Sequence, residues 1–458
     1  MSPDIGCVRL IPIPVLLLED GDFCSWTKSP ITSACQGEFS FDSEASLSFE
    51  ILPFFSMIRA GFAFLSFPIS LPMKRLKVLI LSSSGGAGHL RAAEALHKTA
   101  QGLGLPMKTE NYDCLDFTSP HFKRLYSGTY LNLVNKTPEL WGYLYDKTER
   151  KPYRKKGLVG LFDHFNYSRY LRFLKSSKPD ALVCTHFLPF ISISDEIRRL
   201  GIEMPVFAVT TDFDVHQYWV DPIVYRYYVY HEETRWQLQS KGIPPEKIRI
   251  TGIPVMPEFL KKSGKQFSRR ALGLNDRSFT ILALSGGFGV GRFEEIVRTV
   301  LETLAILSPR RFNLVAVCGK NAAAKAAVEK LKIPVNVHLS PHGFVSNIHD
   351  MMRASDIAVT KSGGLTSSEA LVSGLPMIIV DPIPGQEMRN ADLIVEHGAG
   401  WKAFNLPNLA YKLRKTIAAP DLLGGARRAS RTLARPQAAR DILRDVYETV
   451  ATRKESFV

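Results

Sequence analysis

The residue of this sequence best placed for proton transfer is His89, which directly follows a glycine-rich stretch at 84–88. Residues 76–82 form an apolar run typical of a buried strand, and residues 90–104 have a helical pattern. Glycines let the backbone approach a ligand, and a helix N-terminus favours negative charge. A neutral imidazole there accepts a proton, and the helix dipole helps to keep it unprotonated. The alternative is a histidine that only caps its helix.

Neither glycine-rich loop of the chain predicts a dinucleotide site. That fingerprint requires G-x-G-x-x-G, whereas Gly86 and Gly88 are followed by Arg91 at the position of the third glycine. The second loop, residues 285–291, carries four glycines after another apolar run and also lacks the third glycine. It is either a simple tight turn or a cradle for a pyrophosphate group, with Arg292 close by.

A third segment, residues 361–391, carries the densest set of polar groups. It begins with a Gly-Gly loop that leads into a helix, and Glu369 falls in the first turns of that helix. A carboxylate at this point faces the crevice, where it suits the two hydroxyls of a ribose. Gln386 and Glu387 follow the next apolar run, where their oxygens suit the hydroxyls of a sugar.

From residue 73 onward, the elements that must position these residues alternate between strand and helix. Short apolar runs occur at 76–82, 181–184, 206–209 and 248–251, and a second series begins at 279. The expected fold is therefore α/β, with two Rossmann-like domains facing across a crevice, and ligands beyond the carboxyl ends of the strands. We predict domains at 73–252 and 276–450, a linker at 253–275 and a separate leader at 1–72.

Seven short motifs occur in the order found in one enzyme family. The chain resembles the monogalactosyldiacylglycerol synthase and processive diacylglycerol glucosyltransferase family of inverting GT-B glycosyltransferases. That family is related to the enzyme that adds N-acetylglucosamine to lipid I in peptidoglycan synthesis. The resemblance covers about residues 75–450. Its motifs are GGAGH at 85–89, KTPELWGYLYDKT at 136–148, TDFDVHQYW at 211–219, GIPV at 252–255, HGFVSNI at 342–348, KSGGLTSSEAL at 361–371 and PGQEMRNA at 384–391.

The resemblance implies a role for each candidate residue. His89 would be the general base on the acceptor hydroxyl, Glu369 would hold the ribose, and Gln386 and Glu387 would hold the transferred sugar. The backbone near Phe344 and Val345 would hold the uracil. The remaining candidates would lie along the donor, at Gly287, Gly289, Gly363, Gly364 and Thr366, or on the acceptor side, at Gly86, Gly88, Asp212 and His216.

Residues Asp212 and Asp214 form a D-x-D sequence, which binds a metal and a diphosphate in a different glycosyltransferase fold. Here the pair follows a strand of the first domain, far in sequence from the nucleotide half. We therefore expect no metal site and no cofactor besides the UDP-sugar co-substrate. Asp212 and His216 are expected to shape the acceptor side or to hold their loop by hydrogen bonds.

The net charge of +14 is distributed unevenly, because residues 1–72 carry −5 and the rest of the chain carries +19. Such an excess predicts an anionic partner, and no zinc spacing or aromatic RNA motif supports nucleic acid. The segments 146–156 and 166–175 combine basic and aromatic residues. They are either solvated surfaces or a face that binds an anionic membrane.

Residues 1–72 differ in pattern from everything that follows. Residues 51–70 have the length of a membrane span, but Arg59 lies near the middle, where a charge is costly. Two interpretations stay open: a membrane-associating leader, or a chain that starts at Met73. The six cysteines show no CxxC spacing, which favours a reducing compartment over disulfides. The expected location is the cytoplasmic face of the cell membrane, as a peripheral protein.

The function expected from this resemblance is transfer of a hexose from a UDP-sugar to a lipid acceptor, with diacylglycerol favoured. Two alternatives remain: transfer of N-acetylglucosamine to another lipid-linked acceptor, or a non-catalytic protein that binds UDP-sugars on the same scaffold. The identity of the sugar, the number of sugars added and the oligomeric state are not readable from the residues.

Overall fold

A computed structural model describes residues 75–124, 126, 137–149, 158–287 and 291–455. The leader at 1–72, with its proposed membrane segment and Met73, therefore lies outside the described residues. So do Gly289 of the second glycine loop and residues 150–156 of the basic segment.

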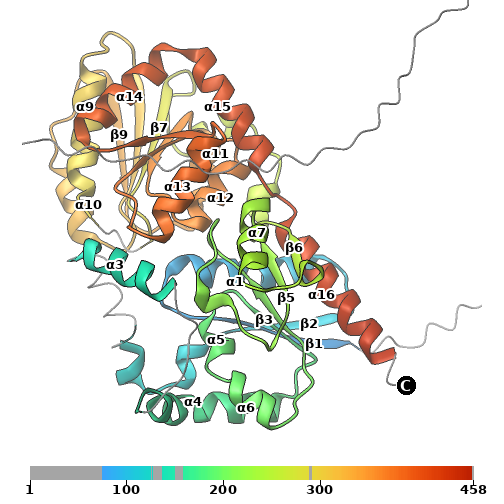
Figure 1. Ribbon diagram of the computed structural model, residues 1–458. Coiled ribbons are helices and arrows are strands. Elements are labelled where there is room, and N and C mark those ends of the chain that lie inside the picture. The colour runs from blue at the N-terminus through green and yellow to red at the C-terminus, as the bar shows by residue number, and fades with distance from the viewer. Residues whose placement is uncertain (1–74, 125, 127–136, 150–157, 288–290, 456–458) are drawn as a thin grey trace, which may run out of the picture. The chain divides into compact units, whose positions relative to one another are not determined.

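Two six-stranded sheets, both entirely parallel, form the framework of the chain (Figure 1). The first has the order β2-β1-β3-β4-β5-β6, and the second has the order β12-β11-β10-β7-β8-β9. The strands of the first sheet are β1 (Leu76–Ser82), β2 (Met107–Asp113), β3 (Ala181–Cys184), β4 (Val206–Val209), β5 (Val224–Val229) and β6 (Ile248–Ile250). Those of the second sheet are β7 (Phe279–Leu284), β8 (Phe312–Val317), β9 (Val337–His342), β10 (Ile357–Thr360), β11 (Met377–Val380) and β12 (Gly400–Ala403). The α/β fold class predicted from the sequence is confirmed.

Helices cover both faces of each sheet, as the fully buried strands require. Those that follow strands of the first sheet are α1 (Ala87–Gly102), α3 (Pro138–Glu149), α4 (Leu158–Ser177), α5 (Leu188–Ile191), α6 (Ser194–Arg199) and α7 (Glu232–Ser240). Those of the second half are α8 (Lys265–Ala271), α9 (Phe293–Ala305), α10 (Ala322–Glu329), α11 (Ile348–Ala354), α12 (Gly364–Val372), α13 (Gln386–Glu396), α14 (Leu406–Ala418) and α15 (Pro420–Leu433). In the described parts of the chain, four short 3-10 helices lie at Cys114–Phe117, Gln217–Trp219, Pro245–Lys247 and Pro257–Leu260. Helix α8 and the last of these lie in the segment predicted as a linker.

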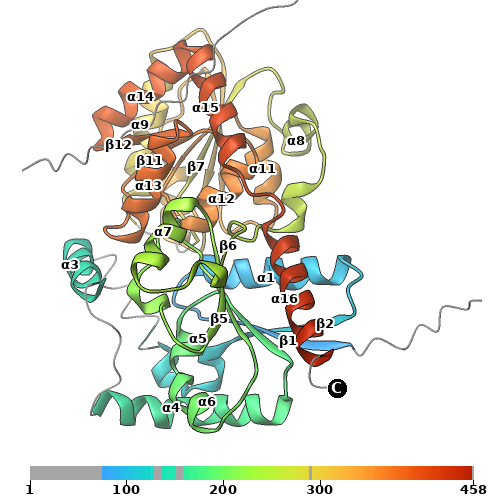
Figure 2. The ribbon, with the colours of Figure 1, turned by 45° about the vertical axis from the view of Figure 1, so that its right-hand side comes forward.

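The last helix, α16 (Ala438–Glu455), returns to the first sheet (Figure 2). Its residues Ile442, Leu443 and Val446 are fully buried against the face that α1 also covers. The chain thus passes between the two halves twice. The two passages touch, because a Cβ on Gly252 would lie 2.2 Å from the Cβ of Arg435. Gly252 also has a φ of 94°, which a residue with a side chain rarely adopts.

Helix α1 is shared by the two halves. Ala93, Leu96 and Ala100 pack on the first sheet, while Ala92 and Ala95 belong to a core that contains Leu365 and other residues of the second half. The small side chains on this second side let α12 approach closely. The N-terminal end of α1, which carries His89, is therefore fixed against both halves.

The aromatic residues Tyr167 and Tyr170 of α4 lie in the core and not on the membrane-facing surface that was one of the two interpretations of this segment. Tyr167 is 2% exposed and Tyr170 is fully buried, and Phe173 stacks on Phe117 with ring centroids 4.5 Å apart. On the opposite side of the same helix Arg169, Arg172 and Lys175 are exposed. The sequence mixes basic and aromatic residues in this segment, but the periodicity of the helix places them on two different faces.

No helix within the described parts of the chain is long and apolar enough to cross a membrane. The described cysteines Cys114, Cys184 and Cys318 are free thiols and buried.

Candidate active site

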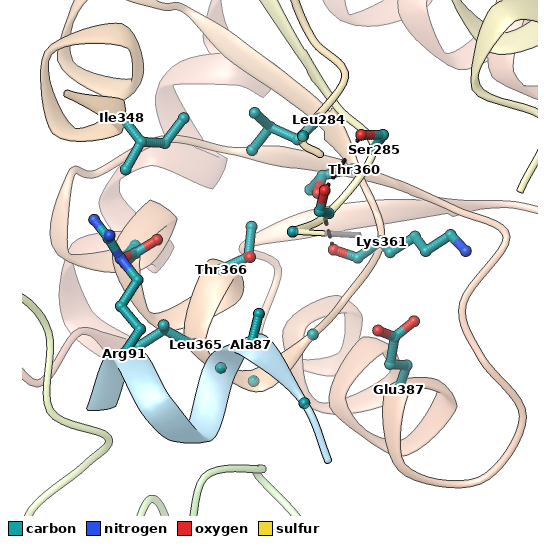
Figure 3. A pocket seen from close by; sticks show the side chains of 18 of the residues that line it. Ala87, Arg91, Leu284, Ser285, Ile348, Thr360, Lys361, Leu365, Thr366 and Glu387 are labelled. Carbon is teal, nitrogen blue, oxygen red and sulfur yellow. Dashed lines mark hydrogen bonds and ion pairs between the residues drawn. The ribbon is translucent and has the colours of Figure 1, made fainter. Parts of the chain in front are cut away.

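A cleft of about 260 Å³ lies where the carboxyl ends of both sets of strands meet (Figure 3). The first half contributes the loop after β1 with the start of α1, and the loop after β4. The second half contributes the loops after β7, β8, β9, β10 and β11. The predicted site residues that line the cleft are Gly86, Gly88, His89, Asp212, Gly287, Phe344, Val345, Gly363, Gly364, Thr366, Glu369, Gln386 and Glu387. Residues more than 250 positions apart in sequence are thereby brought together.

His89 lies in the first turn of α1, and its ring is held through Nδ1. This nitrogen is 3.2 Å from the carbonyl oxygen of Thr185 and 2.6 Å from Oγ1 of Thr211. A carbonyl oxygen only accepts hydrogen bonds, so we assign the proton to Nδ1 and an unprotonated Nε2. Burial lowers the pKa of His89 to about 4, against the opposing effect of the Thr185 carbonyl. The imidazole is therefore neutral at pH 7, with burial rather than the predicted helix dipole as the main cause.

Glu369 lies on α12 and is 4% exposed. Burial raises the pKa of its carboxyl group to about 7, although Arg91 opposes this rise. Arg91 comes from α1 of the first half, and its Nε donates to Oε1 of Glu369 over 3.1 Å. Among the described residues this ion pair uses Oε1, and Oε2 remains for a ligand that donates hydrogen bonds. The carboxylate predicted to hold a ribose is thus supported from across the cleft.

Arg91 is a site residue that the sequence prediction does not include. The sequence marks it only as the side chain that replaces the third glycine of a dinucleotide fingerprint. Its place two residues after His89, at the start of the same helix, was the available signal. Its partner is 278 positions away, so no local pattern connects the two residues.

Glu387 lies at the start of α13, next to Gln386. Its Oε2 accepts a hydrogen bond from the backbone N–H of Ile383 over 2.8 Å. Burial raises the pKa of Glu387 to about 7, while the Ile383 N–H and the charge of Lys361 act in the opposite direction. The carboxyl group is therefore fixed in place at the loop predicted to hold the transferred sugar.

Lys361, rather than Arg292, is the cation beside the second glycine loop. Arg292 donates from two nitrogens to Asp381, each over 2.9 Å, and is not among the described residues that line the cleft. Lys361 lines the cleft, and its Nζ lies 3.3 Å from the position that a Cβ on Gly291 would take. Gly291 has a φ of 95°, so both its conformation and the space around it favour glycine.

His216 lies outside the cleft lining and holds its own loop. Its Nδ1 accepts the backbone N–H of Tyr218 over 3.1 Å, and its Nε2 is 3.1 Å from the carbonyl oxygen of Tyr145. Nε2 is also 3.3 Å from a carboxylate oxygen of Glu149. These contacts tie the loop after β4 to α3. His216 is thus placed to support the acceptor side rather than to contact a ligand in the cleft.

The D-x-D carboxylates are engaged by side chains of α13. Asp212 accepts a hydrogen bond from Asn390 over 2.9 Å, and Asp214 forms an ion pair with Arg389. Burial raises the pKa of Asp212 to about 6. Among the described residues, the group that could hold a metal lies elsewhere: His231, Glu233 and His397 place one potential ligand atom each within 4.8 Å of one another, and none lines the cleft.

The fold and the cleft together are those of the GT-B class, in which two α/β halves place their loops around one cleft. Residues 89–255 match the family model "Monogalactosyldiacylglycerol (MGDG) synthase", and residues 286–432 match "Glycosyltransferase family 28 C-terminal domain". The processive diacylglycerol beta-glucosyltransferase of Bacillus cereus (strain B4264) is 31% identical over 328 residues, which cover 71% of this chain and 82% of that one. The chain therefore belongs to this family of glycosyltransferases.

One further relative agrees with this assignment, and one solved structure shares the fold. The processive diacylglycerol beta-glucosyltransferase of Bacillus subtilis (strain 168) is 27% identical over 372 residues, which cover 81% of this chain and 95% of that one. Among solved structures, MurG of Acinetobacter baumannii superposes with a TM-score of 0.55 and 17% identity, covering 82% of this chain and 99% of the other. At that identity the superposition supports the fold and nothing further.

Proposed function

We propose that the protein transfers a hexose from a UDP-sugar to the free hydroxyl of diacylglycerol, with inversion at the anomeric carbon. The observation that carries this proposal is the meeting of His89 and Glu369 in one cleft, each contributed by a different half. The family and the names of its relatives support diacylglycerol as the acceptor. We assign the acceptor to the side of residues 73–252 and the donor to the side that begins at 276. The predicted end of the donor domain at 450 is too late, because α16 packs on the first sheet.

In the proposed reaction Nε2 of His89 takes the proton from the acceptor hydroxyl. The oxygen attacks the anomeric carbon from the face opposite to the diphosphate, the new C–O bond forms, and the bond to UDP breaks. The leaving diphosphate keeps the electron pair. The N-terminal amides of α12, the glycine loop at 285–287 and Lys361 supply positive potential for it.

Each donor group has a proposed holder. Glu369 accepts hydrogen bonds from the ribose, Gln386 and Glu387 from the sugar, and the backbone at Phe344 and Val345 contacts the uracil. Gly289 keeps its predicted place along the diphosphate but lies outside the described residues. No metal is assigned a role, because the D-x-D carboxylates are occupied by Asn390 and Arg389.

The decisive test is product analysis. Purified protein is incubated with diacylglycerol and UDP-glucose, UDP-galactose or UDP-N-acetylglucosamine, and the lipids are analysed by mass spectrometry. A monohexosyl or oligohexosyl diacylglycerol from one donor is expected. Binding of UDP without any lipid product would favour the non-catalytic alternative, and N-acetylglucosamine on a different lipid would favour the other.

We further propose that the protein reaches its acceptor by peripheral binding to an anionic bilayer on the cytoplasmic side. The exposed residues Arg169, Arg172 and Lys175 on α4 support this proposal, since each basic residue near such a surface contributes about 1 kcal/mol. Vesicles containing phosphatidylglycerol should bind the parent less tightly as salt increases. The triple glutamine variant should bind them more weakly, while its affinity for UDP stays unchanged. Equal vesicle binding by both proteins would exclude this face.

A further inference from the structure

The loop after β4 carries Thr211, Asp212 and Phe213 from the first half onto the N-terminus of α12 in the second half. A Cβ on Gly364 would lie 2.0 Å from the carbonyl oxygen of Thr211, so only glycine permits this approach. Asp212 also accepts a hydrogen bond from the backbone N–H of Gly364. The loop is thus seated directly on the donor half.

Asn390 of α13 fastens this loop with every hydrogen-bonding group of its side chain. It is fully buried. Its Nδ2 donates to Asp212 Oδ1 and to the carbonyl oxygen of Ser362, each over 2.9 Å, and its Oδ1 accepts the N–H of Phe213 over 2.7 Å. Two donors and one acceptor at these positions are what an amide supplies. A carboxylate would face two acceptors, Asp212 and Ser362.

The fastened loop also orients the proposed base. Thr211, which directly precedes Asp212, places its Oγ1 2.6 Å from Nδ1 of His89 and is 4% exposed. Thr211 therefore helps to hold the direction of the ring, while the carbonyl oxygen of Thr185, which only accepts hydrogen bonds, selects the tautomer. The position of Thr211 in turn depends on the contacts of this loop with Gly364 and Asn390. A continuous series of contacts connects Asn390, beside the sugar-binding residues, to the imidazole of the other half.

We propose that Asn390 is a positioning residue, which holds His89 in its catalytic orientation through Asp212 and Thr211 when the two halves are together. This inference rests on the proposed role of His89 as the general base. It assigns to the D-x-D sequence a task other than metal binding. Asp212 and Asp214 contact α13 through Asn390 and Arg389. The base on α1 is thereby aligned relative to the helix that carries Gln386 and Glu387.

The test compares Asn390→Ala and Asn390→Asp with the parent in transfer of the accepted hexose to diacylglycerol. Both variants should lose about 10- to 100-fold in kcat, the loss that a displacement of about 1 Å produces in a reacting group. Affinity for UDP should change little. Asn336→Ala is the matched control, because Asn336 is also buried and donates to the carbonyl oxygens of Leu304 and Arg310. It directly precedes β9, at the end of the strand opposite to the carboxyl end that faces the cleft. It should reduce thermal stability without reducing kcat of the folded protein.

Thr211→Val supplies a second route to the same question if an Asn390 variant does not fold. It should also reduce kcat, and the double variant Thr211→Val/Asn390→Ala should lose much less than the product of the two single losses. Independent losses that multiply would overturn the inference, as would an unchanged kcat in Asn390→Ala. Either result would leave the proposed function standing. A parent protein that makes no glycolipid would overturn the proposed function and this inference with it.

Discussion

Replacing Arg91 with leucine isolates the electrostatic support of Glu369. In the parent the pKa of Glu369 is about 7 because burial raises it, so about half of the carboxyl groups are ionised at pH 7. Loss of an opposite charge in direct contact raises the pKa of a carboxyl group further by about 1–3. In the variant at most about one group in ten is then ionised at pH 7.

The ionised form is the better acceptor for two ribose hydroxyls. A hydrogen bond to a charged group contributes about 1.5–3 kcal/mol, against about 0.5–1.5 kcal/mol for a neutral one. Affinity for uridine at pH 7 should therefore fall about 5- to 10-fold. The loss is no larger because the neutral carboxyl group still accepts a weaker hydrogen bond. Because the carboxylate form becomes more populated as pH rises, affinity for uridine should rise with pH in both proteins. In the parent this rise should be centred near pH 7, and in the variant it should occur at a higher pH.

Isothermal titration with uridine from pH 6 to pH 9 measures both effects. Uridine carries no phosphate, so any direct attraction between Arg91 and the diphosphate is excluded from the comparison. Arg91→Lys keeps the charge and should retain the pH dependence of the parent. If Arg91→Leu binds uridine with the same affinity and the same pH dependence as the parent, the ion pair does not control Glu369.

Three further outcomes follow from the cleft. His89→Ala should lower kcat about 10²- to 10⁴-fold while UDP affinity, measured by titration, is retained. Gly364→Ala should abolish transfer because its Cβ would meet the Thr211 carbonyl oxygen. Gly102→Ala is the control, since a Cβ there would meet no atom within 4 Å. It should leave turnover unchanged and stabilise α1 by up to about 1 kcal/mol in thermal unfolding. Lys361→Met should weaken the binding of UDP but not that of uridine. Arg292→Gln is the control and should weaken neither, because Asp381 holds the Arg292 side chain in the parent. If Lys361→Met loses as much affinity for uridine as for UDP, Lys361 does not act on the diphosphate.

Much of the fold could be predicted because parallel strands buried on both faces are continuous apolar runs. The predicted strand at 76–82 has the bounds of β1, and those at 181–184 and 206–209 have the bounds of β3 and β4. Residues at the carboxyl ends of such strands gather at one edge of a sheet, which is why most of the predicted site residues line one cleft. Their roles remain predictions.

Contacts between the two halves could not be predicted in this way. The pairs Arg91–Glu369 and Asp212–Asn390 join residues 278 and 178 positions apart. Periodicity determines which side of an element is buried, but the pairing of two remote elements depends on how the halves pack. The burial of Tyr167 and Tyr170 shows a related limit, because residue type left open only a solvated surface or a membrane-binding face for a segment whose tyrosines lie in the core.

The return of α16 to the first sheet makes the second half, the proposed donor half, an insertion in chain order within the first half. Its two ends, at Gly252 and Arg435, are in contact. A fragment that stops near residue 252 therefore lacks Ile442, Leu443 and Val446 and leaves a face of its sheet uncovered. Exchange of donor specificity between relatives should accordingly use the cassette from 253 to 434, with α16 kept from the acceptor parent. Because both junctions lie side by side, such a cassette can be replaced without changing the distance that the recipient chain must span.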